Sequence, residues 1–221
     1  MEYQWDFALM WTSLPVLVRG VGVMAQLWVG CFVAGLAIGF LVCLMRLSHS
    51  RVLGAAASAW VEVFRNVPAL IQLIWFFYAF PVLIDTQLTP FVAAFIGIAL
   101  NTSAYCAEIF RAGIQSMETG QWEGAAALGM TRRQAMRRII LPQVFHRMIP
   151  AFTNRGVELA KVTSLASVLS VHELMYQGRL LSATYYRPLE IFTAVALTYF
   201  VVIYPFSYAS HRLEQRLGSR L

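Results

Sequence analysis

The feature that most constrains this chain is an apolar stretch over residues 21–45, which carries no charged side chain and has Gln26 as its only strongly polar residue. A helix that crosses the hydrocarbon core of a bilayer needs about 20 mostly apolar residues, so this stretch is long enough to span a membrane. Three further stretches share its character: Val67–Ile84, Leu88–Ala107 and Ile191–Ser210. The sequence therefore predicts an all-α membrane protein.

A fifth segment, Ile139–Val171, alternates apolar runs with Arg147, Arg155, Glu158 and Lys161. Charges at membrane depth normally face the interior of a helix bundle or a cavity. We interpret this segment as a span buried against protein, the fourth of five in chain order; a re-entrant hairpin is the alternative. On the first span, small residues recur one helical turn apart, as in Gly35-x3-Gly39, which favours close helix packing.

The arginines indicate how the chain is oriented, because cytoplasmic loops carry an excess of positive residues. Five spans place the termini on opposite sides of the membrane. With the N-terminus outside and the C-terminus inside, the outer regions hold only Arg179 and Arg187. The inner regions then hold Arg46, Arg51, Arg111, Arg132, Arg133, Arg137, Arg138, Arg212, Arg216 and Arg220. The start, Met1–Asp6, lacks a positive n-region, so we expect no cleaved signal peptide.

The composition agrees with a bilayer as the main environment and argues against nucleic acid and metal as ligands. Charged residues make up 13% of the chain, whereas soluble domains carry about 25%. The net charge of +6 comes from basic residues at the ends of apolar segments. Cys31, Cys43 and Cys106 lie inside apolar stretches without metal-ligand spacing. No HExxH motif, paired carboxylates or Ser/His/Asp arrangement appears at usable spacing, so we expect no catalytic residue, no metal and no cofactor on this chain.

The strongest local pattern is the polar, arginine-rich segment 123–142. Trp122, Ala125, Leu128 and Gly129 fall at helical spacing and predict a narrow apolar face, with Glu123 near the helix N-terminus. Gly129 predicts the end of this helix, and Thr131 predicts the N-cap of a second helix. An amphipathic helix of this kind can lie in a partner's groove. A loop folded back on its own bundle is an equally good interpretation of the spacing alone.

Several motifs resemble those of binding-protein-dependent ABC transporter permeases, particularly the polar amino-acid uptake subfamily of the glutamate/aspartate, glutamine and histidine type. Glu123, Ala125, Gly129, Ile139, Leu141 and Pro142 match the EAA pattern E-A-A-x3-G-x9-I-x-L-P, with Gly124 replacing an alanine. Further similarities are Phe64-Arg65-Asn66-Val67-Pro68, Ala104-Tyr105-Cys106-Ala107-Glu108-Ile109-Phe110-Arg111-Ala112-Gly113-Ile114, Lys161-Val162-Thr163-Ser164-Leu165 and Tyr186-Arg187-Pro188. These motifs are distributed over most of the chain.

The resemblance implies a single permease domain over residues 1–221, with the type I ABC importer fold and a cytosolic coupling loop at 118–142. It implies a multi-pass protein of the bacterial inner membrane that imports a polar amino acid delivered by an external binding protein. Its partners would be ABC ATPase subunits and a second permease, either a copy or a related chain. The chain lacks the G-x4-G-K-[ST] motif, so ATP and Mg would bind the separate ATPase. Coupling would involve Glu123, Ala125, Ala126, Leu128, Gly129, Leu141 and Pro142.

Polar residues at membrane depth are candidates for the substrate pathway, because they are costly there without a role. The candidates are Arg65, Asn101, Ser103, Tyr105, Glu108, Glu158, Lys161 and Ser164. Pairing among the charges, such as Arg65 with Glu108 and Arg155 with Glu158 and Lys161, is the favoured structural alternative. Val162 replaces an aspartate that the subfamily often has beside the lysine, so an available Lys161 would favour an acidic or neutral amino acid.

Two rival functions remain open from the sequence: a transporter driven by an ion gradient, and a membrane scaffold that recruits a soluble partner without transport. A gradient-driven transporter has no ATPase to dock, so the coupling loop argues against it. A scaffold has no need of charges at membrane depth.

Overall fold

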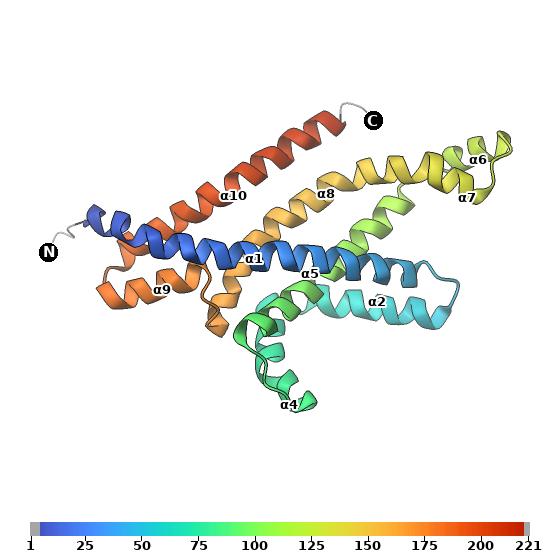
Figure 1. Ribbon diagram of the computed structural model, residues 1–221. Coiled ribbons are helices and arrows are strands. Elements are labelled where there is room, and N and C mark those ends of the chain that lie inside the picture. Colours follow the sequence, from blue (N-terminus) through green and yellow to red (C-terminus); the bar gives the residue numbers. More distant parts are fainter. Residues whose placement is uncertain (1–4, 219–221) are drawn as a thin grey trace.

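The computed structural model describes residues 5–218, with side chains described for residues 5–215, and every regular element in this part is a helix (Figure 1). The prediction that residues 1–6 lack a cleaved signal peptide therefore falls largely outside the described residues, and Arg220 also lies outside them. The α-helices are α1 (Phe7–Arg46), α2 (Arg51–Asn66), α3 (Ala69–Ile74), α4 (Phe80–Ile84), α5 (Pro90–Gln115), α6 (Thr119–Ala127), α7 (Arg132–Ala135), α8 (Leu141–Val162), α9 (Leu174–Tyr185) and α10 (Pro188–Gly218). Two π-helical turns, η1 (Trp75–Ala79) and η2 (Met136–Ile140), and the 3-10 helix η3 (Thr163–Leu169) complete them.

Helix α1 is 40 residues long and begins well before the predicted span. The residues that precede the span are also largely apolar, with Arg19 as their charged member. Asp6 caps the helix by accepting a hydrogen bond from the Leu9 amide at 3.2 Å, which satisfies one of the free amides of the first turn. The membrane-facing stretch is thus part of a longer continuous rod.

The packing of α1 along α5 forms the centre of the molecule. At Gly35 an added Cβ would lie 2.6 Å from Thr102 Cγ2, and at Gly39 it would lie 2.7 Å from the Ser103 carbonyl oxygen. The predicted small-residue spacing therefore permits a close approach of two backbones. The main core beside this contact is formed by Leu27, Cys31, Leu73, Ala93, Ala94, Ile98, Ala99, Leu159, Ala166, Leu169 and Val171.

The second predicted span is bent rather than straight. Helix α2 ends at Asn66, and the chain turns by 105° into α3 and its continuation to Ile84. Val67 is extended at this bend, as expected for a residue that precedes a proline. The arm made by α3, η1 and α4 projects sideways from the bundle (Figure 1).

Within the described residues, three helices are long and apolar enough to cross a membrane: Phe7–Arg46, Pro90–Gln115 and Pro188–Gln215. The bent pair of α2 with residues 69–84 passes the same test together, which makes up to four spans. The charged segment predicted as a further span divides into part of η2, α8 and η3, and it is not among these helices. The length and composition of the helices therefore do not establish the predicted number of five membrane spans.

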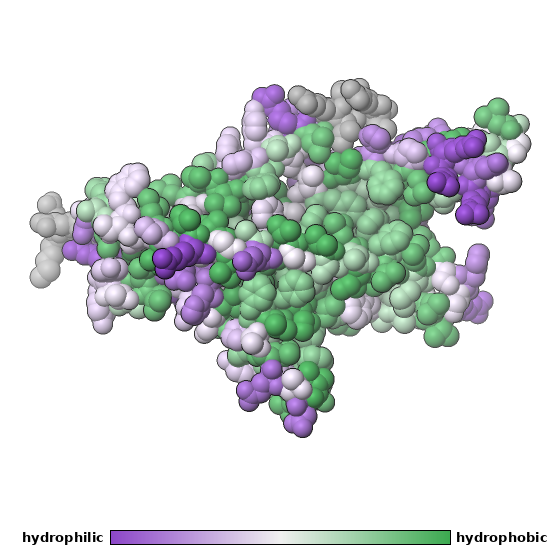
Figure 2. All heavy atoms as spheres, in the orientation of Figure 1, coloured by the Kyte–Doolittle hydropathy of each residue, from purple (hydrophilic) through white to green (hydrophobic). Residues whose placement is uncertain are grey.

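The helices give the molecule two distinct ends. Helix α10 starts beside the beginning of α1, near α9, and runs toward the other end, where α6, α7 and the α1–α2 connection lie (Figure 1). Figure 2 shows a broadly hydrophobic middle and a strongly hydrophilic group over α7 at the projecting tip. An arginine-rich end and an apolar middle are the arrangement expected of a membrane protein.

Candidate functional site

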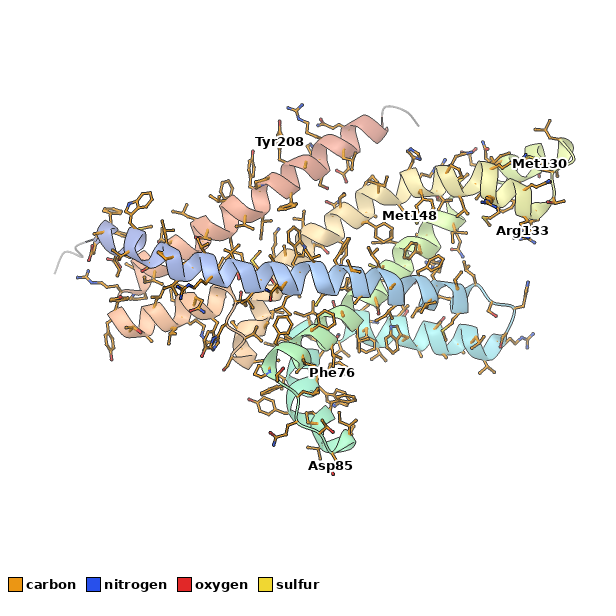
Figure 3. The ribbon with its side chains drawn as sticks, in the orientation of Figure 1. Phe76, Asp85, Met130, Arg133, Met148 and Tyr208 are labelled. Atoms are coloured by element: carbon orange, nitrogen blue, oxygen red, sulfur yellow. The ribbon has the colours of Figure 1, made fainter. Side chains whose placement is uncertain are left out.

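The coupling segment over residues 118–142 is a helix, a tight turn and a second short helix, as predicted. Gly129 adopts a left-handed φ of 71° after α6, and the Met130 amide donates to the Ala125 carbonyl at 3.1 Å. This is the glycine-terminated helix end that the sequence indicated. Thr131 then caps α7 through a reciprocal capping box with Gln134. Met130 and Arg133 mark the projecting tip (Figure 3).

Two details of this segment differ from the prediction. Glu123 lies in the middle of α6 rather than at its N-terminus, because the helix begins at Thr119 after the N-cap Glu118. The expected apolar face is divided: Ala125 is buried, and Trp122 packs against the cluster around Ile140, whereas Leu128 is 78% exposed. The inward part of the face packs against the helical segment that follows the turn, whereas Leu128 and Gly129 are exposed.

The remaining predicted coupling residues lie on both sides of this tip. Glu123 and Ala126 are exposed on α6, while Leu141 and Pro142 begin α8 behind the turn η2. Gln143 Nε2 donates to Gln121 Oε1 at 3.1 Å, which ties the start of α8 to α6. Four exposed arginines follow the turn: Arg132, Arg133, Arg137 and Arg138. The segment is therefore internally braced and strongly basic on its outer surface.

Inside the bundle, Arg155 of α8 is the most buried charged residue near the predicted pathway, at 6% exposure. Its Nη2 donates to Asn101 Oδ1 at 2.9 Å and to Thr102 Oγ1 at 3.3 Å, both on α5. Its guanidinium carbon lies 4.0 Å from the centre of the Tyr105 ring, a cation–π contact. Nη1 reaches Glu158 Oε2 at 3.4 Å. Arg155 thus holds α8 against α5.

Two predicted pathway residues form hydrogen bonds with neighbouring helices in this conformation. Asn101 Nδ2 donates to the Phe64 carbonyl at 2.8 Å, in addition to accepting from Arg155. Ser103 is fully buried and accepts a hydrogen bond from Trp60 Nε1 at 3.1 Å. Both residues connect α5 to α2, so neither presents a free polar group to a substrate.

Glu108 of α5 is the centre of a second charged group. It accepts two hydrogen bonds from Arg111, at 3.1 Å from Nε and 2.7 Å from Nη2. Arg46 of α1 also bonds to it, and Arg65 Nη1 of α2 lies 4.0 Å from Oε2. The expected pairing of Arg65 with Glu108 is present, and two further arginines share the same carboxylate.

Lys161 and Ser164 lie in different surroundings, at a groove of about 540 Å³ between α8 and α10. Tyr199, Tyr204 and Ser207 from α10 line its other wall together with apolar side chains. Lys161 is exposed, and no ion pair joins it to an acidic residue in the described part of the chain. Val162 packs at the edge of the main core. The Ser164 hydroxyl donates to the Lys161 carbonyl at 2.7 Å, and the Tyr199 hydroxyl donates to Glu173 Oε2 at 2.9 Å. The groove therefore offers one cation in a largely apolar setting, and these two hydroxyl groups can serve a ligand only as acceptors.

The structure separates the eight predicted pathway residues by whether they bond to neighbouring helices; Arg65 does so and is still 42% exposed. Arg65, Asn101, Ser103, Tyr105 and Glu108 belong to the α2–α5 contacts. Glu158 pairs with Arg155, and its side chain is nevertheless 64% exposed. Lys161 and Ser164, which follow it along the chain, line the groove beside α10. The sequence did not place Trp60 in this network, nor Gln72, whose Nε2 donates to the Phe64 carbonyl at 3.0 Å. An aromatic and an amide within apolar runs give no periodic signal.

In residues 5–218, no group of three or more His, Cys, Asp or Glu side chains could hold a metal ion. The three cysteines are buried and free.

Comparison with known proteins places this geometry in a defined family. Residues 26–219 match the family described as binding-protein-dependent transport system inner membrane component. The glutamine transport system permease protein GlnP of Escherichia coli K12 is 34% identical over 215 residues, covering 97% of this chain and 98% of that protein. The L-cystine transport system permease protein TcyB of Bacillus subtilis is 36% identical, covering 92% of this chain and 87% of that protein.

Solved structures of ABC transporters contain chains that are similar in structure to this one. A crystal structure of an amino acid ABC transporter with histidines has a chain that is 32% identical, with a TM-score of 0.91, covering 97% of this chain and 100% of that one. An inward-facing structure of the MetNI methionine ABC transporter has a TM-score of 0.74 at 22% identity, covering 91% of this chain and 96% of that one; that likeness concerns the fold alone.

Proposed function

We propose that this chain translocates a polar amino acid. The chain belongs to the family of binding-protein-dependent transport system inner membrane components, and it is thus a multi-pass permease subunit of an ABC importer in the bacterial inner membrane. The amino acid would arrive on an external binding protein. The observation that carries the proposal is the coupling segment, a braced helical hairpin with Leu128 exposed, which projects from a bundle of long apolar helices.

The segment has the mechanical properties that docking requires. The capping box at Thr131 and the glycine turn at Gly129 satisfy free backbone groups at both helix ends. The contact of Trp122 with the cluster below it fixes α6 relative to α8. A movement of a docked ATPase would therefore be transmitted to α8 as a movement of a rigid body, and through Arg155 to α5.

The proposed topology has five spans, with the N-terminus outside and the C-terminus inside. Under it, α8 with its polar residues crosses as a span buried against protein, and the arginine-rich end faces the cytosol. The two distinct ends of the bundle support an odd number of crossings, because α1 begins at one end and α10 runs to the other (Figure 1).

The partners follow from this arrangement. Two ABC ATPase subunits would dock on the coupling segments of two permeases, this chain and a second copy or a related chain. ATP and Mg would bind the ATPase, and this chain would itself be a transporter subunit rather than an enzyme. Closure of the ATPase dimer would draw the two segments together and turn the spans outward, and hydrolysis would reset them.

For the substrate pathway we propose the groove that contains Lys161 and Ser164. An amino acid brings a carboxylate, which requires a cation or a hydrogen-bond donor in an apolar site. Lys161 is the only lysine of the chain. Because no acidic residue in the described part neutralises it, it supports an acidic or neutral amino acid as the substrate class.

The test is co-purification of this chain with its ATPase, combined with ATP-driven amino-acid uptake in proteoliposomes. We expect Gly129→Asp and Glu123→Lys to lose the ATPase or to lose uptake. The matched control is Gly124→Ala, which lies on the same helix, meets nothing within 4 Å and restores helix propensity. The control is expected to keep both activities.

The same experiment separates the rival functions. If wild type and loop variants retain the ATPase and transport alike, the segment is only a connector. Uptake that follows an ion gradient without ATP would indicate a secondary transporter. A bound partner without any uptake of the amino acids tested would indicate a scaffold.

A further inference from the structure

The charges around Glu108 do not balance. Three guanidinium groups, from Arg46, Arg65 and Arg111, lie within 4.0 Å of one carboxylate, which leaves a local excess of two positive charges. Three different helices, α1, α2 and α5, bring them together. Like charges held this close repel one another, and the repulsion is strong where water is restricted. The arrangement is therefore suited to a further anion.

No acidic side chain nearby supplies that anion within the described residues. Glu62, one turn before Arg65 on α2, accepts a hydrogen bond from Asn66 Nδ2 at 2.7 Å and forms no ion pair within 4.0 Å of the arginines. Glu158 is paired with Arg155. The Tyr105 ring lies under Arg65 at 5.4 Å and under Arg155 at 4.0 Å. Arg65 of the cluster and Arg155 beyond it thus share an uncharged neighbour.

The guanidinium of Arg65 is the one most available to a ligand. Its side chain is 42% exposed, compared with 23% for Arg46 and 29% for Arg111. It is also the most distant of the three from Glu108. The ring of Tyr105 lies on one side of it, 5.4 Å from its guanidinium carbon.

Exposed apolar residues lie next to Arg46 and Arg65 along the chain. Leu44 is 49% exposed and Leu47 is 41% exposed at the end of α1, and Val63 is 55% exposed on α2. A free anion would make no use of these side chains, whereas a lipid places an anionic headgroup and its acyl chains together. Basic pockets between helices on the cytoplasmic side are a recognised form of lipid headgroup site.

We propose that Arg46, Arg65 and Arg111 form a binding site for an oxyanion, and that its occupant is the phosphate of an anionic phospholipid of the cytosolic leaflet. Arg65 makes the adjustable contact, because Arg46 and Arg111 are already bound to Glu108. The assignment to the cytosolic leaflet rests on the orientation under the proposed function; the oxyanion site itself rests only on the positions of the arginines.

The test measures retained lipid on the complex of this chain with its ATPase. The complex is reconstituted in nanodiscs that contain phosphatidylglycerol and phosphatidylcholine, extracted, and analysed by mass spectrometry for lipid that stays bound. We expect Arg65→Gln to retain about fivefold less phosphatidylglycerol, as follows from about 1 kcal/mol per arginine near an anionic surface. Arg65→Lys keeps the charge and is expected to retain an intermediate amount, which separates loss of the site from loss of the fold.

The matched control is Arg51→Gln, an exposed arginine at the other end of α2, which should retain phosphatidylglycerol as the wild type does. Equal retention by wild type and Arg65→Gln would overturn the proposal, as would equal losses in Arg65→Gln and Arg51→Gln. A second arm adds inorganic phosphate to complexes in phosphatidylcholine alone. Thermal stabilisation of wild type but not of Arg65→Gln, without selective phosphatidylglycerol retention, would transfer the site to a soluble anion and overturn the lipid assignment.

The outcome is distinguishable from failure of the proposed function. ATPase co-purification and ATP-driven uptake are measured on the same preparations, and neither depends on which lipid remains bound after extraction. A wild-type complex that transports but binds no phosphatidylglycerol would refute the lipid site alone. A chain that binds phosphatidylglycerol but carries no ATPase would refute the coupling function alone.

Discussion

The coupling segment and the charged centre of the bundle use polar residues in opposite ways. In the coupling segment, Leu128 and four arginines are exposed, while the capping box at Thr131 and the bond from Gln143 to Gln121 brace the segment internally. In the centre, Arg155 and Asn101 bond to each other and to neighbouring helices and expose almost nothing. Polar residues on the tip are therefore available for partners, whereas most of those at membrane depth hold the bundle together.

This difference changes how charges at membrane depth are interpreted. Such a residue is a functional candidate by default, yet five of the eight candidates here connect α2 and α5. Their contribution to transport would be to make these helices move as one body. The accessible residues Lys161 and Ser164 are then the better candidates for contact with the substrate.

The largest effect is expected from Arg155→Ala. The change removes the cation that satisfies Asn101 Oδ1 and stacks on Tyr105, and it leaves a cavity between α5 and α8. Buried truncations and unsatisfied polar groups each destabilise a fold substantially, and together we expect about 3–5 kcal/mol. Thermal unfolding in detergent, followed by size-exclusion chromatography, measures the loss. Arg132→Ala, on the exposed tip, should unfold like the wild type. If the two variants unfold at the same temperature, Arg155 does not hold the centre together.

The second effect concerns the tip. Leu128→Asp replaces an exposed apolar side chain and should leave the fold intact. If Leu128 is a central contact with the ATPase, its loss should weaken docking by about 2 kcal/mol, roughly thirtyfold in affinity. Titration of the purified ATPase against the permease in nanodiscs measures the affinity. Phe145→Asp, an exposed apolar residue on α8 away from the tip, serves as the control. Comparable affinities for both variants would remove Leu128 from the interface.

The third effect concerns the close approach of α1 to α5. A methyl group at Gly39 would press on the Ser103 carbonyl at 2.7 Å and on Cys106 Cβ at 2.6 Å. Overpacking of this kind destabilises by about 1–3 kcal/mol, so Gly39→Ala should lower the unfolding temperature. Gly22→Ala is the internal control, because nothing lies within 4 Å of the added methyl group. The contact is not as tight as described if both glycines accept alanine equally.

The sequence predicted the helical membrane class, the coupling hairpin and its Gly129 turn, because apolar run length and helix-end residues are local signals. It could not predict that α1 extends from Phe7 or that α2 turns by 105° into α3, since tertiary packing decides where a continuous apolar helix ends. It also could not divide the apolar face of α6 into a buried and an exposed part. That division depends on the position of Ile140 and its neighbours, which only the fold supplies.

The charged residues show the same limit. Helical spacing suggested that Arg155, Glu158 and Lys161 could neutralise one another, and the first two are paired as expected. Lys161 instead lines the groove beside α10, and the residues of α10 are distant from Lys161 in the sequence. The three arginines at Glu108 are residues 46, 65 and 111, which lie on three different helices. Residue spacing along a single helix cannot predict that they meet.

The smallest effect is expected at Lys161, where the comparison between structural and accessible charges can be tested directly. Lys161→Met removes an exposed cation that has no ion pair among the described residues, so the fold should be unaffected. If this ammonium attracts the acidic or neutral substrate, its loss should shift preference away from L-glutamate relative to L-arginine by about fivefold, the equivalent of roughly 1 kcal/mol for one solvent-accessible hydrogen bond. Competition of both amino acids against uptake in proteoliposomes measures the shift. Arg51→Met removes the same charge from α2 and controls for a general change of surface potential. An unchanged order of competitors in Lys161→Met would place Lys161 outside the pathway, and the groove between α8 and α10 would then be a packing feature like the centre of the bundle.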